Sequence, residues 1–207
     1  MEEWPCQDGR FLRSGFYTLD SVHVCRFDII TFDFTGPEDE SGILQSRENV
    51  NKLIEQEINE DIPSSRVVVG GFSQGGSMTL VTGLTSPHRL AGLAVLSGWL
   101  AIRGKVKEVW MLVSHQRLRG LTRLWQLLGQ PATATPIFWG HGVEDPLVPL
   151  AIGQFSKREL ENVGVKEAEE SGKPGVFFKG YPGLGHSTDM QEINDWAYWL
   201  KKVIPPA

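Results

Sequence analysis

The segment around Ser73 constrains the fold of this chain more than any other part of the sequence. A β-branched run at 67–69 leads directly into Gly71-Phe72-Ser73-Gln74-Gly75, and a helical stretch up to Thr82 follows. The five residues match G-x-S-x-G, a pattern that needs a sharp strand-to-helix turn holding the serine hydroxyl above the edge of a sheet. Because the chain has 23 glycines, the pattern alone is weak evidence, and its place between strand and helix carries the argument. The alternative is a glycine-rich turn that binds an anion or nothing.

Helical and strand-like segments alternate along the rest of the chain. Apolar spacing predicts one helix from near Ile43 to a stop at Pro63, and another over 150–163. A last helix carries an apolar stripe made of Ile193, Trp196, Ala197, Leu200 and Ile204. Short apolar runs at 93–96, 137–139 and 176–178 predict buried strands. We therefore expect an α/β fold, with a mostly parallel sheet flanked by helices, in a single domain over 1–207.

Charge and composition narrow the function classes. The net charge of −5 and the acidic pI of about 5.6 argue against nucleic-acid partners. The sequence contains no stretch of roughly 18 apolar residues that would suit a membrane span. Cys6 and Cys25 form neither a metal motif nor a disulfide framework. We expect a soluble cytoplasmic protein, with the nucleus as a further location, that uses no metal and no cofactor.

A serine hydroxyl becomes a good nucleophile only when a base takes its proton. Proteins with this turn use the chain order serine, acid, histidine. His186, in a glycine-containing loop before the last helix, is the only histidine that follows every candidate acid. Asp145 and Glu144 both follow the predicted strand at 136–139; we prefer Asp145 because Pro146 fixes the turn after it. The pattern therefore predicts a triad of Ser73, Asp145 and His186, against the alternative that His186 is an ordinary surface histidine.

Two further groups bear on this chemistry. His141 precedes the acid in the chain, so the ordering rule predicts a structural role for it, hydrogen-bonded beneath the site. The backbone N–H of Gln74 is the expected first donor to an oxyanion. A second donor usually comes from a glycine-rich loop after an earlier strand, and the sequence before Ser73 has no such loop. We therefore expect impaired activity.

Several strings make the chain similar to a known family. They are Gly70 to Gly76, Glu38 to Ile43, Ile62 to Arg66, Leu96 to Leu100, Gly140 to Gly142 and Asp145 to Pro149. Together they resemble the acyl-protein thioesterases, also called the lysophospholipase or phospholipase/carboxylesterase family, of the α/β-hydrolase superfamily. The resemblance runs from about residue 27 to 205.

The resemblance implies an α/β-hydrolase fold with Ser73 as nucleophile, Asp145 as acid and His186 as base. It implies hydrolysis of the thioester that links a long acyl chain to protein cysteines, so S-acylated proteins are the expected substrates and lysophospholipids or other carboxylesters related ones. We expect an apolar acyl groove beside the triad, lined by Trp99, Leu100, Leu147 and Val148.

Two segments depart from the family pattern. Residues 1–26 are atypical, which indicates that the N-terminal strands are missing or incomplete, although 21–25 could supply one short strand. Residues 109–135 form an atypical insertion in which basic and apolar side chains mix. We expect an ordinary helix or a splice-derived insertion there, and a membrane-surface helix is the alternative. The alternative function is a truncated pseudoenzyme that binds acyl chains or partners, and the missing oxyanion loop is its main support.

Overall fold

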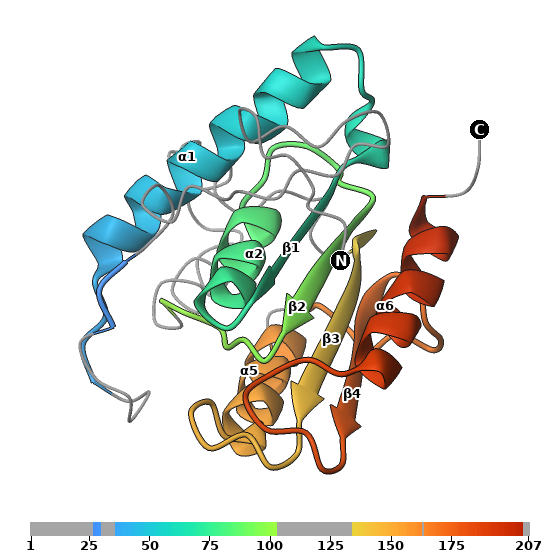
Figure 1. The fold of residues 1–207 in the computed structure, drawn as a ribbon. Helices are drawn as coiled ribbons and strands as arrows, with labels where there is room; N and C mark the ends of the chain where they lie inside the picture. Colours follow the sequence, from blue (N-terminus) through green and yellow to red (C-terminus); the bar gives the residue numbers. More distant parts are fainter. Residues whose placement is uncertain (1–26, 30–35, 103–133, 163, 205–207) are drawn as a thin grey trace, which may run out of the picture.

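Four parallel strands form the sheet that carries the candidate site at its carboxyl ends (Figure 1). The structure is a computed structural model, and it describes residues 27–29, 36–102, 134–162 and 164–204. The elements in chain order are α1 (Glu40–Asn59), the short 3₁₀ helix η1 (Ser64–Arg66), β1 (Val68–Phe72), α2 (Gln74–Leu84), β2 (Gly92–Leu96), β3 (Pro136–Gly142), α5 (Leu150–Asn162), β4 (Gly175–Tyr181) and α6 (Met190–Val203).

The strands lie in chain order, β1-β2-β3-β4, and every neighbouring pair is parallel. The register places Phe72 beside Leu96, and Leu96 beside Gly140. The carboxyl ends of β1, β2 and β3 therefore meet at one edge of the sheet. A serine that follows β1 and an acid that follows β3 are brought to the same edge by this register.

Side-chain alternation along the strands divides the core between the two faces of the sheet. On one face, Val95 and Trp139 belong to a cluster that α1, α2 and α5 complete with Ile54, Leu80, Leu84 and Leu160. On the other face, Leu96 and Phe138 pack against Trp199 of α6. Figure 1 shows α6 across the sheet from α1 and α2. Because both faces are covered, every residue of β2 is buried, as the continuous apolar run predicts.

The helix boundaries follow from their caps. Asp39 accepts a hydrogen bond from the Gly42 N–H, so α1 begins at Glu40, a little before the predicted start near Ile43. It ends at Asn59, ahead of Pro63, and Asp61 then adopts a positive φ of 67°. Asp189 caps α6 in the same way by accepting from the Glu192 N–H.

The apolar stripe of α6 is rotated from the one predicted. Trp199, which the predicted stripe omitted, is fully buried, whereas Ala197 is exposed. The side chains that face the sheet are Trp196, Trp199, Leu200 and Val203. These four keep the spacing of one helical face, so the period was predicted correctly and the phase was wrong.

The α/β fold with a parallel sheet covered on both faces is confirmed. Residues 27–29, at the start of the apolar run after Arg26, form no regular element. The candidate strand at 21–25 lies outside the described residues, as does the insertion at 109–135 except for its last two residues. In the part of the chain that the structure describes, no helix is long and apolar enough to cross a membrane.

Candidate active site

The turn at Ser73 is sharp and strained. Ser73 has a φ of 56° and a ψ of −119°, a conformation that a non-glycine residue rarely adopts. Its N–H donates to the Leu96 carbonyl at 2.7 Å, which ties the turn to the end of β2. A Cβ at Gly71 would lie 2.3 Å from the carbonyl carbon of Gly75, so only glycine lets the strand and the helix approach this closely. The predicted strand–turn–helix is therefore present.

His186 lies between the other two predicted triad residues. It comes from the loop between β4 and α6, and Asp145 comes from the turn after β3. The His186 Nδ1 is 2.7 Å from Asp145 Oδ2, and its Nε2 is 2.9 Å from Ser73 Oγ. Three loops that are distant in sequence thus place carboxylate, imidazole and hydroxyl in one hydrogen-bonded row, the arrangement that lets an imidazole take a serine proton.

Asp145 is buried and held ionised by its partners. Burial acts to raise its pKa, but the hydrogen bonds from His186, Val148 and Leu147 outweigh burial and bring the pKa below its ordinary value. Its Oδ1 accepts from the N–H groups of Leu147 and Val148, each at 2.9 Å. An ionised carboxylate can only accept, so the His186 proton sits on Nδ1 and the lone pair of Nε2 faces Ser73.

Glu144, the alternative acid, does not contact His186. Its side chain is exposed, and its Oε2 accepts a hydrogen bond from the Gly183 N–H at 2.6 Å. Its own N–H donates to the Leu184 carbonyl. Glu144 therefore ties the acid turn to the loop that carries His186. This link has no signal in the sequence, because the two loops meet only as a result of the pairing of β3 with β4.

Gln74 is the first residue of α2, immediately after Ser73. The first N–H groups of a helix have no acceptor within it, so the Gln74 N–H is available at the end of α2 where Ser73 lies. The Gln74 side chain has a separate role, since its Nε2 donates to the Phe27 carbonyl at 2.6 Å. The expectation of a missing second oxyanion donor concerns the whole segment before Ser73, of which the structure describes only residues 27–29 and 36–72, so it stays a prediction.

The residues expected to line an acyl groove separate into three places. Trp99 and Val148 are buried in one apolar cluster with Phe27 and Met78. Leu100 lies elsewhere: it packs in the main core, and its N–H donates to Ser156 of α5. Leu147 is 54% exposed next to the acid.

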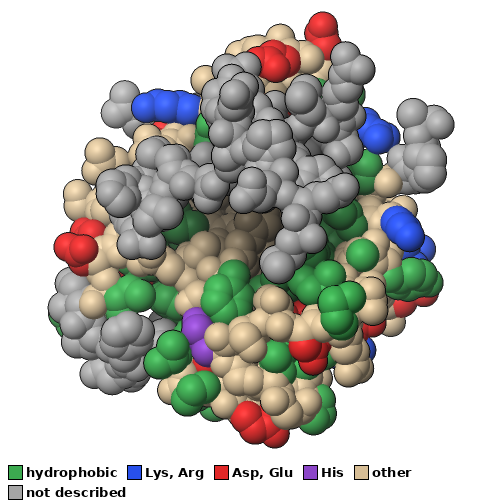
Figure 2. All heavy atoms as spheres, in the orientation of Figure 1, with side chains coloured by type: hydrophobic (Ala, Val, Ile, Leu, Met, Phe, Trp, Pro, Cys, Tyr) green, Lys and Arg blue, Asp and Glu red, His purple; other side chains and the backbone are tan. Residues whose placement is uncertain are grey.

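Sequence reasoning missed one contact of the catalytic imidazole. The ring of Phe72, the x residue of G-x-S-x-G, packs on the His186 ring with 4.8 Å between centroids. Phe72 and Leu147 are both partly exposed beside the triad. Figure 2 shows hydrophobic side chains bordering a hollow on the face that it presents.

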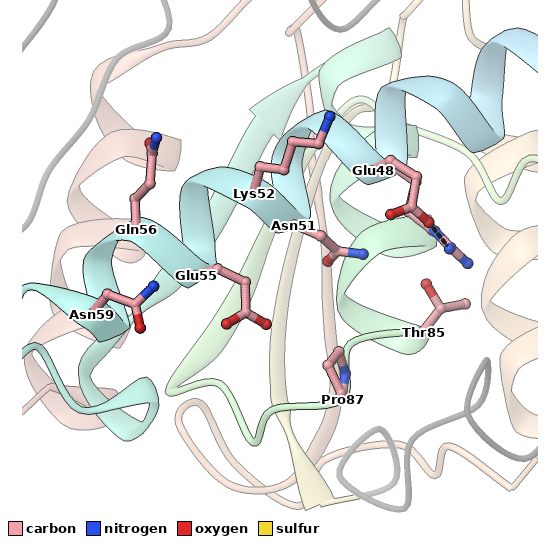
Figure 3. Close-up of a pocket in the computed structure, with 9 residues that line it drawn as sticks. Glu48, Asn51, Lys52, Glu55, Gln56, Asn59, Thr85 and Pro87 are labelled. Atoms are coloured by element: carbon pink, nitrogen blue, oxygen red, sulfur yellow. Dashed lines mark hydrogen bonds and ion pairs between the residues drawn. The ribbon is translucent and has the colours of Figure 1, made fainter.

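A cavity of about 600 Å³ lies elsewhere, between the outer side of α1 and the turn after α2 (Figure 3). Most of its lining residues carry charged or amide side chains, and Glu55 of α1 points toward Pro87, whereas Lys52 points away from it. None of the triad residues lines it. Since the cavity is separate from the triad, the candidate site remains the edge of the sheet.

Comparison with known proteins agrees with this geometry. The family model described as Phospholipase/Carboxylesterase matches residues 22–118. Acyl-protein thioesterase 1 of Aspergillus fumigatus is 37% identical over 169 residues, covering 82% of this chain and 60% of the relative. Acyl-protein thioesterase 1 of Mycosarcoma maydis is 38% identical, covering 86% of this chain and 69% of the relative.

The chain thus spans less than two thirds of the length of the first of these relatives. Among solved structures, Arabidopsis thaliana SOBER1 is similar with a TM-score of 0.69 and 32% identity, covering 86% of this chain and 73% of that one. The predicted resemblance is confirmed: this chain belongs to the phospholipase/carboxylesterase family that includes the acyl-protein thioesterases.

Proposed function

We propose that this protein is a serine hydrolase that cleaves the thioester between a long acyl chain and a protein cysteine. The observation that carries the proposal is the hydrogen-bonded row Asp145–His186–Ser73, with Nε2 of the histidine 2.9 Å from the serine Oγ. Its membership of a family that includes acyl-protein thioesterases supports the choice of a thioester among the acyl compounds that such a triad can cleave.

In the first half of the reaction, Ser73 Oγ attacks the carbonyl carbon of the thioester while His186 Nε2 takes the hydroxyl proton. The Gln74 N–H donates to the oxyanion that forms on the carbonyl oxygen. The C–S bond then breaks, and His186 returns its proton to the leaving cysteine sulfur. The acyl group remains on Ser73 as an ester.

In the second half, water attacks this ester, and His186 again takes a proton, now from water. The Ser73–acyl bond breaks, Oγ regains its proton from His186, and a fatty acid leaves. Asp145 stays ionised throughout: its lowered pKa keeps the carboxylate available to stabilise the imidazolium that forms twice in each cycle.

Val148 follows the acid closely in sequence and shares an apolar cluster with Trp99, while Leu147 beside the acid is exposed, so the acyl chain is proposed to lie along these side chains. The same apolar surroundings would serve the acyl chain of a lysophospholipid, and they suit transient contact with the membrane surface where S-acylated proteins reside. The assembled triad favours an active enzyme over a pseudoenzyme that only binds acyl chains.

The test is turnover of an S-palmitoyl cysteine peptide by the purified chain, beside S-acetyl peptide as a short-chain competitor. We expect hydrolysis by the wild-type chain, preference for the long chain, and no hydrolysis by Ser73→Ala. Hydrolysis that persists in Ser73→Ala would exclude the proposed nucleophile. Equal or better cleavage of the acetyl peptide would exclude the long-chain substrate.

A further inference from the structure

A second histidine lies beneath the acid turn, outside the triad. His141, near the end of β3, is completely buried, whereas His186 and His88 both retain exposed surface. Its ring stacks on Phe178 of β4, with 6.3 Å between centroids. On the other side it lies against Gly153 of α5, where an added Cβ would come within 2.8 Å of the His141 Nδ1. The ring is therefore confined between a strand and a helix.

The hydrogen bonds of His141 fix its tautomer. Its Nε2 is 2.8 Å from the Val148 carbonyl oxygen, which can only accept, so Nε2 carries the hydrogen. Its Nδ1 is buried and has no hydrogen-bond partner among the described residues, so a proton there would be unsatisfied. Burial lowers the pKa of His141, more than the Val148 bond and the charge of Asp145 raise it. The imidazole is therefore neutral, with its hydrogen on Nε2.

Val148 connects this buried imidazole to the acid. Its carbonyl accepts from His141, and its N–H donates to Asp145 Oδ1 at 2.9 Å. With Oδ1 occupied in this way, Oδ2 is the oxygen left for His186, at 2.7 Å from Nδ1. Together with the Leu147 N–H, which donates to the same oxygen at 2.9 Å, Val148 thus sets which way the carboxylate faces.

We propose that His141 is a positioning residue for the triad: by holding the Val148 carbonyl, it sets the orientation of the Asp145 carboxylate toward His186. The proposal rests on the proposed serine-hydrolase function. The neutral state of His141 matters as well, because its Nε2 is only 3.9 Å from Asp145 Oδ2. A charged ring at that distance would compete with the His186 imidazolium for the same carboxylate.

The test compares His141→Leu with His141→Gln in the full chain. Leucine removes the donor, and the glutamine side-chain amide can place an N–H near the position of Nε2. Turnover is expressed per active site, counted by fluorophosphonate labelling, so that misfolded protein does not enter the result. We expect the leucine variant to lose about tenfold to hundredfold in kcat with little change in KM, the cost of a slightly misplaced catalytic group.

The pH profile separates positioning from a purely structural role. Without a well-oriented carboxylate the His186 imidazolium is less stabilised, so we expect the acid limb of kcat/KM to move to lower pH in His141→Leu. The glutamine variant should restore both kcat and the acid limb to near wild type. If His141 only stabilised the fold, His141→Leu would lower the number of active sites. It would leave kcat per active site and the acid limb of kcat/KM unchanged.

Gly153→Ala provides a second variant that keeps His141. Its methyl group would press on Nδ1 of a ring that Phe178 and Val148 prevent from moving freely. Alanine also favours a helix more than glycine does, so this variant should fold. We expect the same loss of kcat and the same shift of the acid limb as in His141→Leu, though smaller.

The proposal is overturned if His141→Leu keeps wild-type kcat per active site and an unchanged acid limb, or if His141→Gln loses as much as His141→Leu. If the wild-type chain reacts with fluorophosphonate but cleaves no acyl thioester, the proposed substrate fails, and labelling rates still test His141. If the wild-type chain does not react with fluorophosphonate at all, the low-field NMR signal of the His186 Nδ1 proton tests the role of His141 instead. The proposal requires that signal to change in the leucine variant and to persist in the glutamine variant.

Discussion

The two glycines of G-x-S-x-G are equivalent in the sequence pattern, but the structure gives them different tasks. A Cβ at Gly71 would lie 2.3 Å from the Gly75 carbonyl carbon and 2.4 Å from its oxygen. A Cβ at Gly75 has no described atom within 4 Å. Among the described residues, a steric collision therefore requires glycine at 71 but not at 75. Substituting each by alanine provides a matched pair of variants.

We predict that Gly71→Ala is costly and Gly75→Ala is not. An ordinary carbon contact is about 3.5–4.0 Å, so alanine at 71 must displace the backbone of α2 by about 1 Å. Overpacking of this kind typically costs about 1–3 kcal/mol of stability. It also moves the residue that carries the nucleophile, and a displacement of about 1 Å can cost a factor of about 100 in rate.

Thermal unfolding and the second-order rate of fluorophosphonate labelling measure the two effects. For a chain of this size each kcal/mol lowers Tm by about 2–4 °C. Gly71→Ala should therefore lose several degrees and about 100-fold in labelling rate, while Gly75→Ala should stay within about threefold of wild type with an unchanged Tm. Equal behaviour of the two variants, in either direction, would refute the reasoning.

Three further predictions concern the catalytic acid Asp145, the buried carboxyl of Glu192 and the exposed side chain of Leu147. Asp145→Asn should lower kcat by about 10⁴-fold because the histidine tautomer is no longer held, whereas Glu144→Gln should lose less than tenfold; a larger loss in the Glu144 variant would contradict the choice of acid. Glu192 is fully buried, and burial raises its pKa to about 7 from an ordinary 4.5. The folded protein then binds a proton that the unfolded chain has released, so the free energy of unfolding should fall by about 3 kcal/mol as pH rises from about 4.5 to 7 and above. Glu192→Gln should flatten this decline, which denaturant titrations at several pH values measure. A variant whose free energy of unfolding falls with pH as steeply as that of the wild type would contradict the prediction. Leu147→Ser, at an exposed position, should raise KM for long-chain esters selectively without changing Tm, and a parallel rise for acetyl esters would argue against contact with the acyl chain.

Much of this fold follows from local pattern. The run Val67–Val69 before Gly71 and the continuous apolar segment at 93–96 both indicate parallel strands. Only the second is fully buried, with both of its faces covered, whereas the residues of β1, at the end of the described sheet, are half-buried or exposed. Ser73, Asp145 and His186 each follow a strand, and the carboxyl ends of parallel strands lie at the same edge of the sheet. The three residues are therefore expected to meet there. These inferences need only the spacing of residues along the chain.

Other features depend on register and helix phase, which the sequence does not contain in readable form. The phase of α6 is set by the pocket that Trp199 fills beside Phe138, so the stripe predicted from Ile193 and Ala197 was rotated. Leu100 and Trp99 are adjacent in sequence, yet their side chains enter different clusters because Ser77 and Ser156 hold their two backbone N–H groups from separate helices.

The central claim is that Ser73 is a nucleophile activated by His186. The most direct measurement is mass-spectrometric mapping of the adduct after the full chain reacts with a fluorophosphonate. The geometry predicts a single adduct on Ser73, absent in Ser73→Ala and formed far more slowly in His186→Ala. An adduct on Ser187, or labelling at the wild-type rate without His186, would contradict the account.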